Sequence, residues 1–341
     1  MARHRIAIIG LGMAATPHAK SLLDLRDRVD VVAAFSPTAE RRRSFAERFP
    51  FPQSDDLEAT LADRGIDAVL ILTPPNTHLE LVERAAGAGK HILLEKPLEI
   101  GVDRARRLVE ICAARGVTLG VVLQHRFRPA AIRLRTLMEE GVLGQLVAAS
   151  ARIPLWRPQS YYDQPGRGTR ARDGGGVLLT QGIHTLDLLL SLAGPVETVM
   201  ACATTTPLHR METEDLVAAS LRYRNGALGT VEATTAAYPG FAEQIDLVAE
   251  HGHASLAGTA LAVTLQDGRR IEIPPDESPG GTGADPMAFP HDYHRALIAD
   301  FLDALDRGGT PRASGAAALE VQVLIEAMLK SATSGRAEPA I

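Results

Sequence analysis

A rare lysine follows a short apolar run. The segment HILLEKPLEI, residues 91–100, is typical of a buried strand that ends at Glu95, Lys96 and Pro97. Only four lysines occur in the chain, at positions 20, 90, 96 and 330, whereas arginine is common. Arginine stays protonated in proteins, but a lysine ammonium can release its proton when its surroundings lower its pKa. Lys96 is therefore a candidate acid or base, and the alternative is a surface lysine before a loop proline.

A second titratable residue lies in DGGGVLLTQGIHTLDLLLSLAGP, residues 173–195. The residues after the three glycines predict a helix, on which Thr180 and His184 share one face because they are four apart. Asp187 is three residues further on and could orient the ring of His184. An imidazole titrates near neutral pH and can serve as a general acid or base. The alternative is a buried histidine whose hydrogen bonds are satisfied by Asp187.

The first part of the chain alternates apolar strands with helices. This pattern predicts a parallel sheet that is covered on both faces and binds ligands beyond the carboxyl ends of its strands. The expected strands are 5–10, 30–35, 67–74, 91–97 and 117–126. The expected helices are 18–25, 39–49, 77–89 and 102–116.

The first turn between strand and helix has the pattern G-x-G-x-x-A over residues 10–15. Gly10 permits a tight turn, Gly12 lets a pyrophosphate approach the backbone, and a small residue at position 15 keeps helix and strand close. We expect a dinucleotide to contact Gly10, Gly12, Met13 and Ala14. The alternative, an empty structural turn, is less consistent with the position of the motif at the start of a βαβ unit.

The end of the second strand bears on which dinucleotide binds. NAD sites usually place an acid there for the ribose hydroxyls, whereas this strand ends in FSPT, residues 35–38. Ser36 and Thr38 could donate to a 2′-phosphate, and Arg41 or Arg42 could pair with it. The alternative for the arginines is a solvated helix face. The sequence favours NADP over NAD, and use of both remains open.

The segment TPPNTH, residues 73–78, follows the third strand. Thr73 and Pro74 are expected at the carboxyl edge, beside the cofactor. Asn76 is predicted to be the N-cap of the next helix or to face a ribose. His78 is counted among the cofactor contacts, although a histidine in a first helical turn is more often structural.

The second half predicts an α+β domain with a large, open and mostly antiparallel sheet. Short turns such as RNG and QDG separate some of its strands. The uncovered face of such a sheet favours a homodimer or homotetramer. Residues 274–290 predict a mobile loop, residues 315–332 a final helix, and the expected domains are 1–124 and 125–341. The expected strands are 145–153, 196–205, 215–223, 227–235, 243–250, 253–266 and 270–273.

Bulk composition excludes several classes of protein. A net charge of −5 argues against a nucleic-acid binder with a broad basic face. No apolar run reaches the roughly 20 residues of a membrane helix, and the N-terminus does not resemble a signal peptide. Cys112 and Cys202 have no metal-binding spacing and suggest no disulfide framework, so a metal site is not expected. These features predict a cytoplasmic protein.

Taken together, these motifs resemble the family of glucose–fructose oxidoreductase, inositol dehydrogenase and MocA-like proteins. The resemblance covers nearly the whole chain, and it implies a Rossmann domain followed by an α/β domain with an open sheet. The motifs are the GLG turn at 10–12, TPPNTH at 73–78, EKPLEI at 95–100, HRFRP at 125–129 and GGGVLLTQGIHTLDLL at 174–189.

The resemblance also implies roles for particular residues. Lys96 would lie beside the nicotinamide, preceded by Glu95, and relay a proton from the substrate oxygen. His184 matches the family's catalytic histidine. The family usually has Asp, or Asn in a sugar-nucleotide branch, where this chain has Thr180. Thr180 can position the substrate but cannot carry the proton, and Arg126 in HRFRP is an expected substrate contact.

Finer similarities point to the nucleotide-sugar 3-dehydrogenase branch. The segment WRPQSYYDQPGRGT, residues 156–169, resembles the substrate loop of that branch, with Arg157, Tyr161 and Tyr162 as candidate contacts. Gly166 and Arg170 replace its usual tryptophans, which leaves a smaller sugar or polyol open. The expected activity is hydride transfer at a secondary carbinol. The alternatives are a non-catalytic sugar sensor and a trans-dihydrodiol dehydrogenase.

Overall fold

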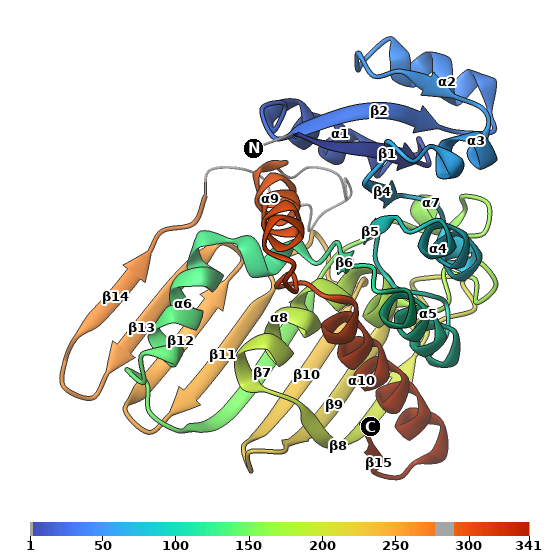
Figure 1. Cartoon of the computed structure of the whole chain (residues 1–341). Helices are drawn as coiled ribbons and strands as arrows, with labels where there is room; N and C mark the ends of the chain where they lie inside the picture. Colours follow the sequence, from blue (N-terminus) through green and yellow to red (C-terminus); the bar gives the residue numbers. More distant parts are fainter. Residues whose placement is uncertain (1–2, 277–289, 341) are drawn as a thin grey trace. The chain divides into compact units, whose positions relative to one another are not determined.

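The computed structural model describes residues 3–276 and 290–340, which form two compact units (Figure 1). Unit 1 comprises residues up to 124 together with 291–319, and unit 2 comprises 125–290 with 320–341. The two units first divide between residues 124 and 125. The prediction that everything after 125 forms the second domain is wrong, because 291–319 folds with unit 1.

Unit 1 contains a six-stranded sheet with the order β3-β2-β1-β4-β5-β6. All its strands are parallel, which confirms the class of sheet that the sequence predicted. This order is that of dinucleotide-binding sheets. The strands are β1 His4–Ile9, β2 Val29–Phe35, β3 Gln53–Ser54, β4 Ala68–Ile71, β5 His91–Leu94 and β6 Leu119–Val121. The helices between them are α1 Ala15–Asp24, α2 Ala39–Ala46, α3 Leu57–Ala62, η1 Pro75–Thr77, α4 His78–Gly87 and α5 Val102–Arg115.

The returning segment brings α9 (Asp292–Arg307) against α1. The buried face of α9 includes His294, Leu297, Ile298 and Phe301, at the spacing of an amphipathic helix. Beyond α9, the carbonyl of Ala313 accepts the N–H of Val121 at 2.8 Å. The segment is therefore tied to the sheet of unit 1 by packing and by a main-chain hydrogen bond.

Unit 2 is built on a nine-stranded sheet with the order β14-β13-β12-β11-β7-β10-β9-β8-β15. All neighbours are antiparallel except β7 and β10, which confirms the mostly antiparallel prediction. The strands are β7 Leu146–Pro154, β8 Val196–Thr204, β9 Leu216–Tyr223, β10 Leu228–Thr234, β11 Gln244–Ala249, β12 Gly252–Ala257, β13 Ala260–Leu265, β14 Arg270–Ile273 and β15 Glu338–Pro339.

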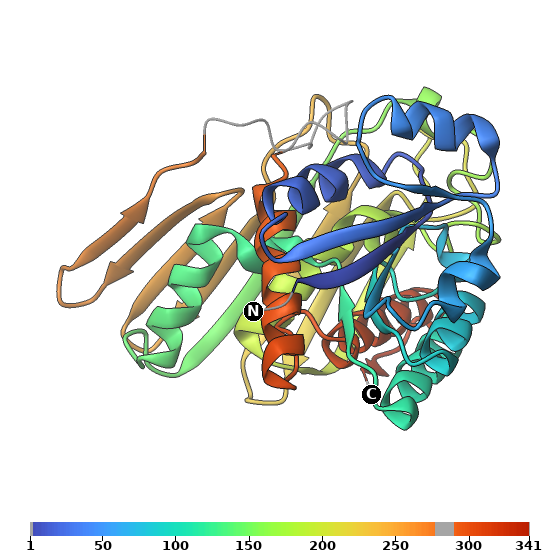
Figure 2. The same cartoon turned by 45° about the horizontal axis from the view of Figure 1, so that its top comes forward.

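In the part of the chain that the structure describes, helices cover one face of this sheet. Figure 2 shows α6 and α8 lying over it, and they contact β7 and β11 to β13. Along the strands, buried and exposed residues alternate, so the other face remains exposed in the single chain. The helices after residue 124 are η2 Gln124–Phe127, α6 Pro129–Glu139, α7 Gln159–Tyr162, η3 Leu178–Gly182, α8 Ile183–Ala193 and α10 Gly315–Ser334, which crosses the boundary between the units.

Some predicted elements differ from the structure. The expected strand 253–266 is a hairpin, because Gly258 adopts a φ of +61° and reverses the chain between β12 and β13. The short strands β3 and β15 were not predicted. Most of the predicted loop 274–290 lies outside the described residues.

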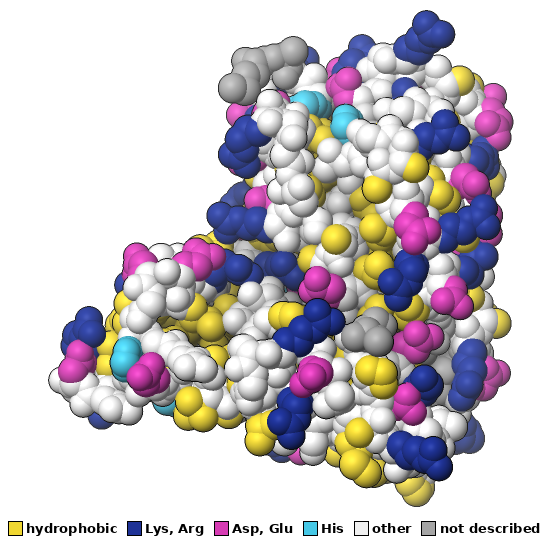
Figure 3. Space-filling view, turned by 60° about the horizontal axis from the view of Figure 1, so that its bottom comes forward, with side chains coloured by type: hydrophobic (Ala, Val, Ile, Leu, Met, Phe, Trp, Pro, Cys, Tyr) yellow, Lys and Arg dark blue, Asp and Glu magenta, His cyan; other side chains and the backbone are white. Residues whose placement is uncertain are grey.

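Two surface properties bear on the kind of partner. On the face drawn in Figure 3, basic and acidic side chains are interspersed, and neither sign forms a continuous patch. Within residues 3–276 and 290–340, no helix combines the length and the apolar character that crossing a bilayer requires.

Candidate active site

The carboxyl edge of the unit 1 sheet gathers the predicted cofactor residues. In the strand register Ile9 pairs with both Phe35 and Ile71, and Ile71 pairs with Leu94. The residues that follow each strand therefore emerge side by side along one edge. The Gly10 turn, the tip at Ser36, the TPPNTH segment and the loop of Lys96 all begin there.

The turn at residues 10–15 fits a pyrophosphate group. Gly10 has a φ of +101°, and a Cβ there would lie 3.0 Å from Leu72, so glycine is required. A Cβ on Gly12 would meet nothing within 4 Å, which leaves space beside the backbone. Helix α1 has no side-chain N-cap and no acid in its first turn, so its N-terminal N–H groups can face an anion. Met13 is exposed and Ala14 half-buried.

The residues at the tip of β2 that were expected to bind a 2′-phosphate are of two kinds: some stabilise the tip itself, and others are exposed to a ligand. Ser36 is buried, and its hydroxyl accepts the N–H of Thr38 at 3.3 Å. Arg42 donates to the carbonyl of Ser36 at 2.6 Å and to Asp55 at 3.3 Å, so it stabilises the tip itself. Thr38 and Arg41 are exposed, which leaves their donor groups accessible to a ligand.

The TPPNTH segment corrects one prediction. Asn76 is not the N-cap of the next helix, because it lies inside the short helix η1 and Thr77 precedes α4. Asn76 is exposed, whereas Thr73 is half-buried and accepts a hydrogen bond from the hydroxyl of Thr77 at 2.8 Å. Pro74, like Asn76, is exposed at this edge.

His78 links two loops. It is 0% exposed, and its Nδ1 lies 3.0 Å from the carbonyl oxygen of Pro97 and 3.1 Å from that of Leu98. Its Nε2 lies 2.9 Å from the carbonyl oxygen of Thr73. Burial lowers the pKa of His78, which favours the neutral ring. Any effect of His78 on a cofactor therefore passes through the loops that it joins, and a direct contact is not consistent with its burial.

The backbone at Lys96 is held by its neighbour Glu95. The N–H of Lys96 donates to Oε2 of Glu95 at 3.0 Å, and Oε1 of Glu95 lies 2.9 Å from Nε2 of His18. Burial raises the pKa of the Glu95 carboxyl, but the hydrogen bond from His18 and the charge of Lys96 outweigh it and leave that pKa below its ordinary value. Lys96 itself is half-buried.

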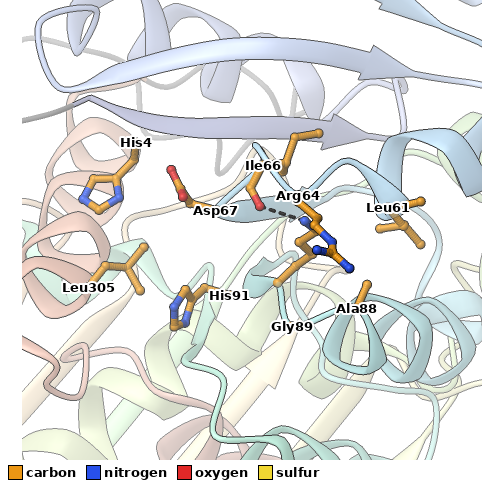
Figure 4. A pocket seen from close by; sticks show the side chains of 11 residues that line it. His4, Leu61, Arg64, Ile66, Asp67, Ala88, Gly89, His91 and Leu305 are labelled. Carbon is orange, nitrogen blue, oxygen red and sulfur yellow. Dashed lines mark hydrogen bonds between the residues drawn. The ribbon is translucent and has the colours of Figure 1, made fainter.

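The other buried lysine has a different role. The ammonium of Lys90 donates to the carbonyl oxygens of Asp63 at 2.5 Å and Ile66 at 2.8 Å. It lines a hollow of about 560 Å³ at the amino ends of β1, β4 and β5 (Figure 4). That edge is opposite the one where Lys96 emerges. Lys90 therefore stabilises a loop, and the scarcity of lysine in this chain does not mark Lys90 as a catalytic residue.

In unit 2, Thr180 and His184 belong to consecutive helical elements. Residues Leu178–Gly182 form a π-helix, and α8 begins at Ile183, so the predicted single α-helix is wrong in its first turn. The hydroxyl of Thr180 donates to the carbonyl of Gly176 at 2.7 Å. Both Thr180 and His184 are half-buried. Single π-turns within helices are frequent at functional sites.

The predicted pairing of His184 with Asp187 is not observed. Asp187 is 0% exposed and accepts two hydrogen bonds from Arg126, at 2.7 Å from Nε and at 2.6 Å from a terminal nitrogen. This bidentate pair joins the HRFRP segment to α8. Arg126 was predicted to contact substrate, and its guanidinium instead holds a carboxylate inside the protein.

The ring of His184 lies beside a second histidine that the sequence did not single out. The ring centroids of His125 and His184 are 5.0 Å apart, with planes inclined by 31°. Nε2 of His125 lies 2.7 Å from one terminal nitrogen of Arg128, and the other terminal nitrogen of Arg128 forms an ion pair with Glu243. The sequence feature that could have identified His125 is its position at the start of the HRFRP motif.

The predicted substrate loop is largely engaged with the protein. Tyr162 is 7% exposed, and its hydroxyl lies 2.7 Å from that of Thr235. Burial raises the pKa of Tyr162 well above its ordinary value. Arg157 is also buried and donates to the carbonyl of Trp156 at 2.7 Å. Tyr161 is half-buried, with the guanidinium groups of Arg157 and Arg167 at 5.9 and 5.0 Å from its ring centroid, so it retains some surface for a ligand.

A buried carboxylate that the sequence analysis missed holds the glycine turn before the π-helix. Both oxygens of Glu214 accept the N–H of Gly176 at 3.1 Å, and Oε1 also accepts the N–H of Leu178 at 3.3 Å. A Cβ on Gly176 would lie 1.8 Å from the carbonyl oxygen of Glu214, so only glycine fits there. Burial raises the pKa of Glu214, and the main-chain hydrogen bonds only partly offset this.

Substitutions of Glu214 test whether its side chain stabilises the glycine turn before the π-helix. Glu214→Ala leaves buried N–H groups without acceptors and should lower the free energy of unfolding by about 1–3 kcal/mol. Glu214→Gln keeps the shape. The pKa of Glu214 is raised in the folded state. The stabilising contribution of its protonated carboxyl to the free energy of unfolding is therefore present at acidic pH and is lost as pH rises through that pKa. Denaturant unfolding should therefore show Glu214→Gln gaining stability relative to wild type between acidic and neutral pH. A stability difference between Glu214→Gln and wild type that does not change with pH would contradict the raised pKa of Glu214.

Comparisons with known proteins agree with this arrangement. Residues 4–123 match the model of an oxidoreductase family with an NAD-binding Rossmann fold. Residues 131–255 match the GFO/IDH/MocA C-terminal domain. The two matches fall on the two units and together span most of the chain.

Named relatives align with 78–99% of the chain. Myo-inositol 2-dehydrogenase of Thermotoga maritima is 28% identical over 276 residues, or 78% of this chain and 80% of the relative. D-apiose dehydrogenase of Paraburkholderia graminis is 27% identical, over 98% and 89% of the two chains. The WlbA dehydrogenase of Bordetella pertussis, solved with NADH and UDP-GlcNAcA, is 28% identical over 99% of both chains, with a TM-score of 0.84. The chain is therefore a member of the GFO/IDH/MocA family of oxidoreductases.

Proposed function

We propose that the chain is an NAD(P)-dependent dehydrogenase or reductase whose substrate is a sugar, sugar derivative or polyol. The hydride would pass between a secondary carbinol carbon and C4 of the nicotinamide. The observation that carries this proposal is the convergence, at one sheet edge, of the Gly10 turn and the loop that presents Lys96. A titratable ammonium beside a dinucleotide site is what alcohol oxidation needs.

The residues of unit 1 would hold the cofactor in a defined way. The backbone at Gly10 and Gly12 and the N-terminus of α1 would bind the pyrophosphate. Thr73, Pro74 and Asn76 would line the same edge further along the sheet. The nicotinamide supplies or accepts the hydride when it is bound.

We propose Lys96 and His184 as the two groups that handle the proton. Lys96 would bind the substrate oxygen and hold or take its proton through Nζ, stabilising the oxyanion as the carbon is oxidised. His184 would serve as the second acid or base. Thr180 cannot carry charge, so its role would be to position the substrate through its hydroxyl.

The relatives support a polar, hydroxyl-rich substrate, because two are named for inositol and apiose and a third was solved with UDP-GlcNAcA. Tyr162 and Arg157 form hydrogen bonds within the protein, so fewer side chains are available to bind a large nucleotide. We therefore favour a free sugar or polyol over a nucleotide sugar.

A substrate panel tests the proposal. The purified chain is incubated with NAD or NADP and individual polyols, aldoses, nucleotide sugars and trans-dihydrodiols, and reduced-nicotinamide fluorescence is followed. We expect turnover with at least one sugar or polyol. Binding of dinucleotide and sugar without turnover in either direction would instead support the sensor alternative. Turnover restricted to dihydrodiols would contradict the proposed substrate class.

We propose NADP as the preferred cofactor, with Arg41 binding its 2′-phosphate. Loss of one charge-assisted contact costs about 1.4 kcal/mol, or roughly tenfold. Arg41→Ala should therefore lower the ratio of kcat/KM for NADP to that for NAD by about tenfold, measured by steady-state kinetics. Arg43→Ala, at another exposed position of α2, is the matched control and should leave the ratio unchanged. A ratio that Arg41→Ala does not alter would remove Arg41 from the phosphate site.

We propose that the uncovered face of the unit 2 sheet forms a homodimer or homotetramer interface. Met200, Leu228 and Val248 are 56%, 54% and 44% exposed on that face, where a partner would bury them. Met200→Glu combined with Leu228→Glu should shift the mass measured by light scattering toward the monomer. Leu208→Glu, at an exposed loop position, should not. An unchanged mass in the double variant would refute this interface.

We place the protein in the cytoplasm, because its two cysteines are free thiols.

A further inference from the structure

Three titratable side chains from separate segments of unit 1 meet below the carboxyl edge of its sheet. His18 comes from α1, Glu95 follows β5, and His294 comes from α9. One nitrogen or oxygen of each lies within 4.8 Å of those of the other two. Among residues 3–276 and 290–340, no other group of His, Cys, Asp and Glu side chains has this spacing.

The spacing is compatible with one metal ion. Nε2 of His18 lies 2.9 Å from Oε1 of Glu95, and the rings of His18 and His294 are perpendicular, with centroids 4.9 Å apart. Zinc bonds to nitrogen and oxygen are about 2.0–2.2 Å long, so two ligands of one ion lie at most about 4.3 Å apart. Side-chain shifts of a few tenths of an ångström would bring all three groups to such an ion.

Burial and hydrogen bonding favour a ligand at this position. His18 is 0% exposed and His294 3%, while the side chain of Glu95 is 13% exposed. Oε2 of Glu95 accepts the N–H of Lys96, and ligating carboxylates are commonly oriented by such a bond.

The donor atoms indicate which ion would bind. Imidazole nitrogens suit zinc, cobalt, nickel and copper, whereas magnesium and calcium prefer an all-oxygen shell.

We propose that His18, Glu95 and His294 form a binding site for one divalent transition-metal ion of the zinc type. The ion would connect α1, the loop of Lys96 and α9, and so fasten the returning segment 291–319 to the rest of unit 1. Three protein ligands leave at least one position for solvent. The sequence did not predict a metal site, because its ligands come from three distant segments and none is a cysteine.

Metal binding to the full chain tests the proposal directly. The protein is stripped with a chelator and titrated with Zn²⁺ by calorimetry. We expect one ion per chain, a raised melting temperature, and no competition from Mg²⁺. His294→Phe and His18→Gln should each weaken binding by more than tenfold, since loss of an outer-shell partner alone costs about 10–100-fold.

Controls separate this site from surface binding. His291→Gln, on the same helix segment, and His253→Gln, in an exposed position, should bind Zn²⁺ as the wild type does. Should a cluster variant fail to fold, X-ray absorption of the Zn²⁺-loaded wild type should still report imidazole ligands. Absence of Zn²⁺ uptake by the wild type, binding that persists in both cluster variants, or a shell without imidazole would overturn the site.

Discussion

Lys96→Met should lower turnover by at least about a hundredfold, the lower range of general acid–base catalysis, and leave dinucleotide binding unchanged. Methionine keeps the apolar stem of lysine but has no ammonium with which to bind the substrate oxygen or take its proton. The Gly10 turn and the N-terminus of α1 would hold the pyrophosphate through main-chain N–H groups. Turnover is followed by nicotinamide absorbance and binding by calorimetry.

Two further variants define what the ammonium does. Lys96→Arg keeps the positive charge but cannot release a proton, so it should be nearly as inactive as Lys96→Met. Lys20→Met, which changes an exposed lysine of α1, is the matched control and should be fully active. Near-wild-type rates in Lys96→Arg would assign Lys96 a purely electrostatic role, and near-wild-type rates in Lys96→Met would remove it from the reaction.

Asp187→Ala should cost about 3–5 kcal/mol of the free energy of unfolding, which is the typical result of breaking a buried ion pair. The change leaves the guanidinium of Arg126 in the protein interior without the carboxylate that accepts two of its hydrogen bonds. Thermal and denaturant unfolding measure the loss. Since the pair anchors the helix that carries His184, the activity of the remaining folded protein should fall as well.

A double substitution separates the unpaired charge from the loss of packing. Replacing the pair with apolar residues of similar volume, Arg126→Met with Asp187→Leu, should restore most of the stability, because no unpaired charge remains. Glu232→Ala breaks the exposed pair with Arg152 and should have little effect. If Asp187→Ala is no more harmful than Glu232→Ala, the pair does not hold α8 in place.

Local patterns sufficed for five strands of the unit 1 sheet, β1, β2, β4, β5 and β6, and for the position of the glycine turn at residues 10–15. The short apolar strands, the glycines at 10 and 12 and the alternation with helices each follow from chemistry within a few residues. The return of α9 to unit 1 does not follow from local chemistry. Its apolar face, with Leu297 and Phe301, was readable as a helix, but which sheet it would cover depends on packing far along the chain.

The candidate site was predicted by residue type and only partly by role. Lys90 and Lys96 are both rare lysines that flank β5, yet Lys90 donates to two loop carbonyls at the opposite edge. His78 and Tyr162 belong to motifs expected to touch ligands, and tertiary burial turns both into structural residues. Burial and partner choice are set by the whole fold, so a single sequence cannot assign them.

A crystal structure with bound NAD(P)⁺ and a sugar that the enzyme oxidises slowly tests the central claim most directly. We expect Nζ of Lys96 and a ring nitrogen of His184 each to lie within about 2.6–3.2 Å of the reacting hydroxyl, or one water away from it. The carbinol hydrogen should face C4 of the nicotinamide. A substrate bound at C4 with neither nitrogen within reach of its hydroxyl would contradict the account.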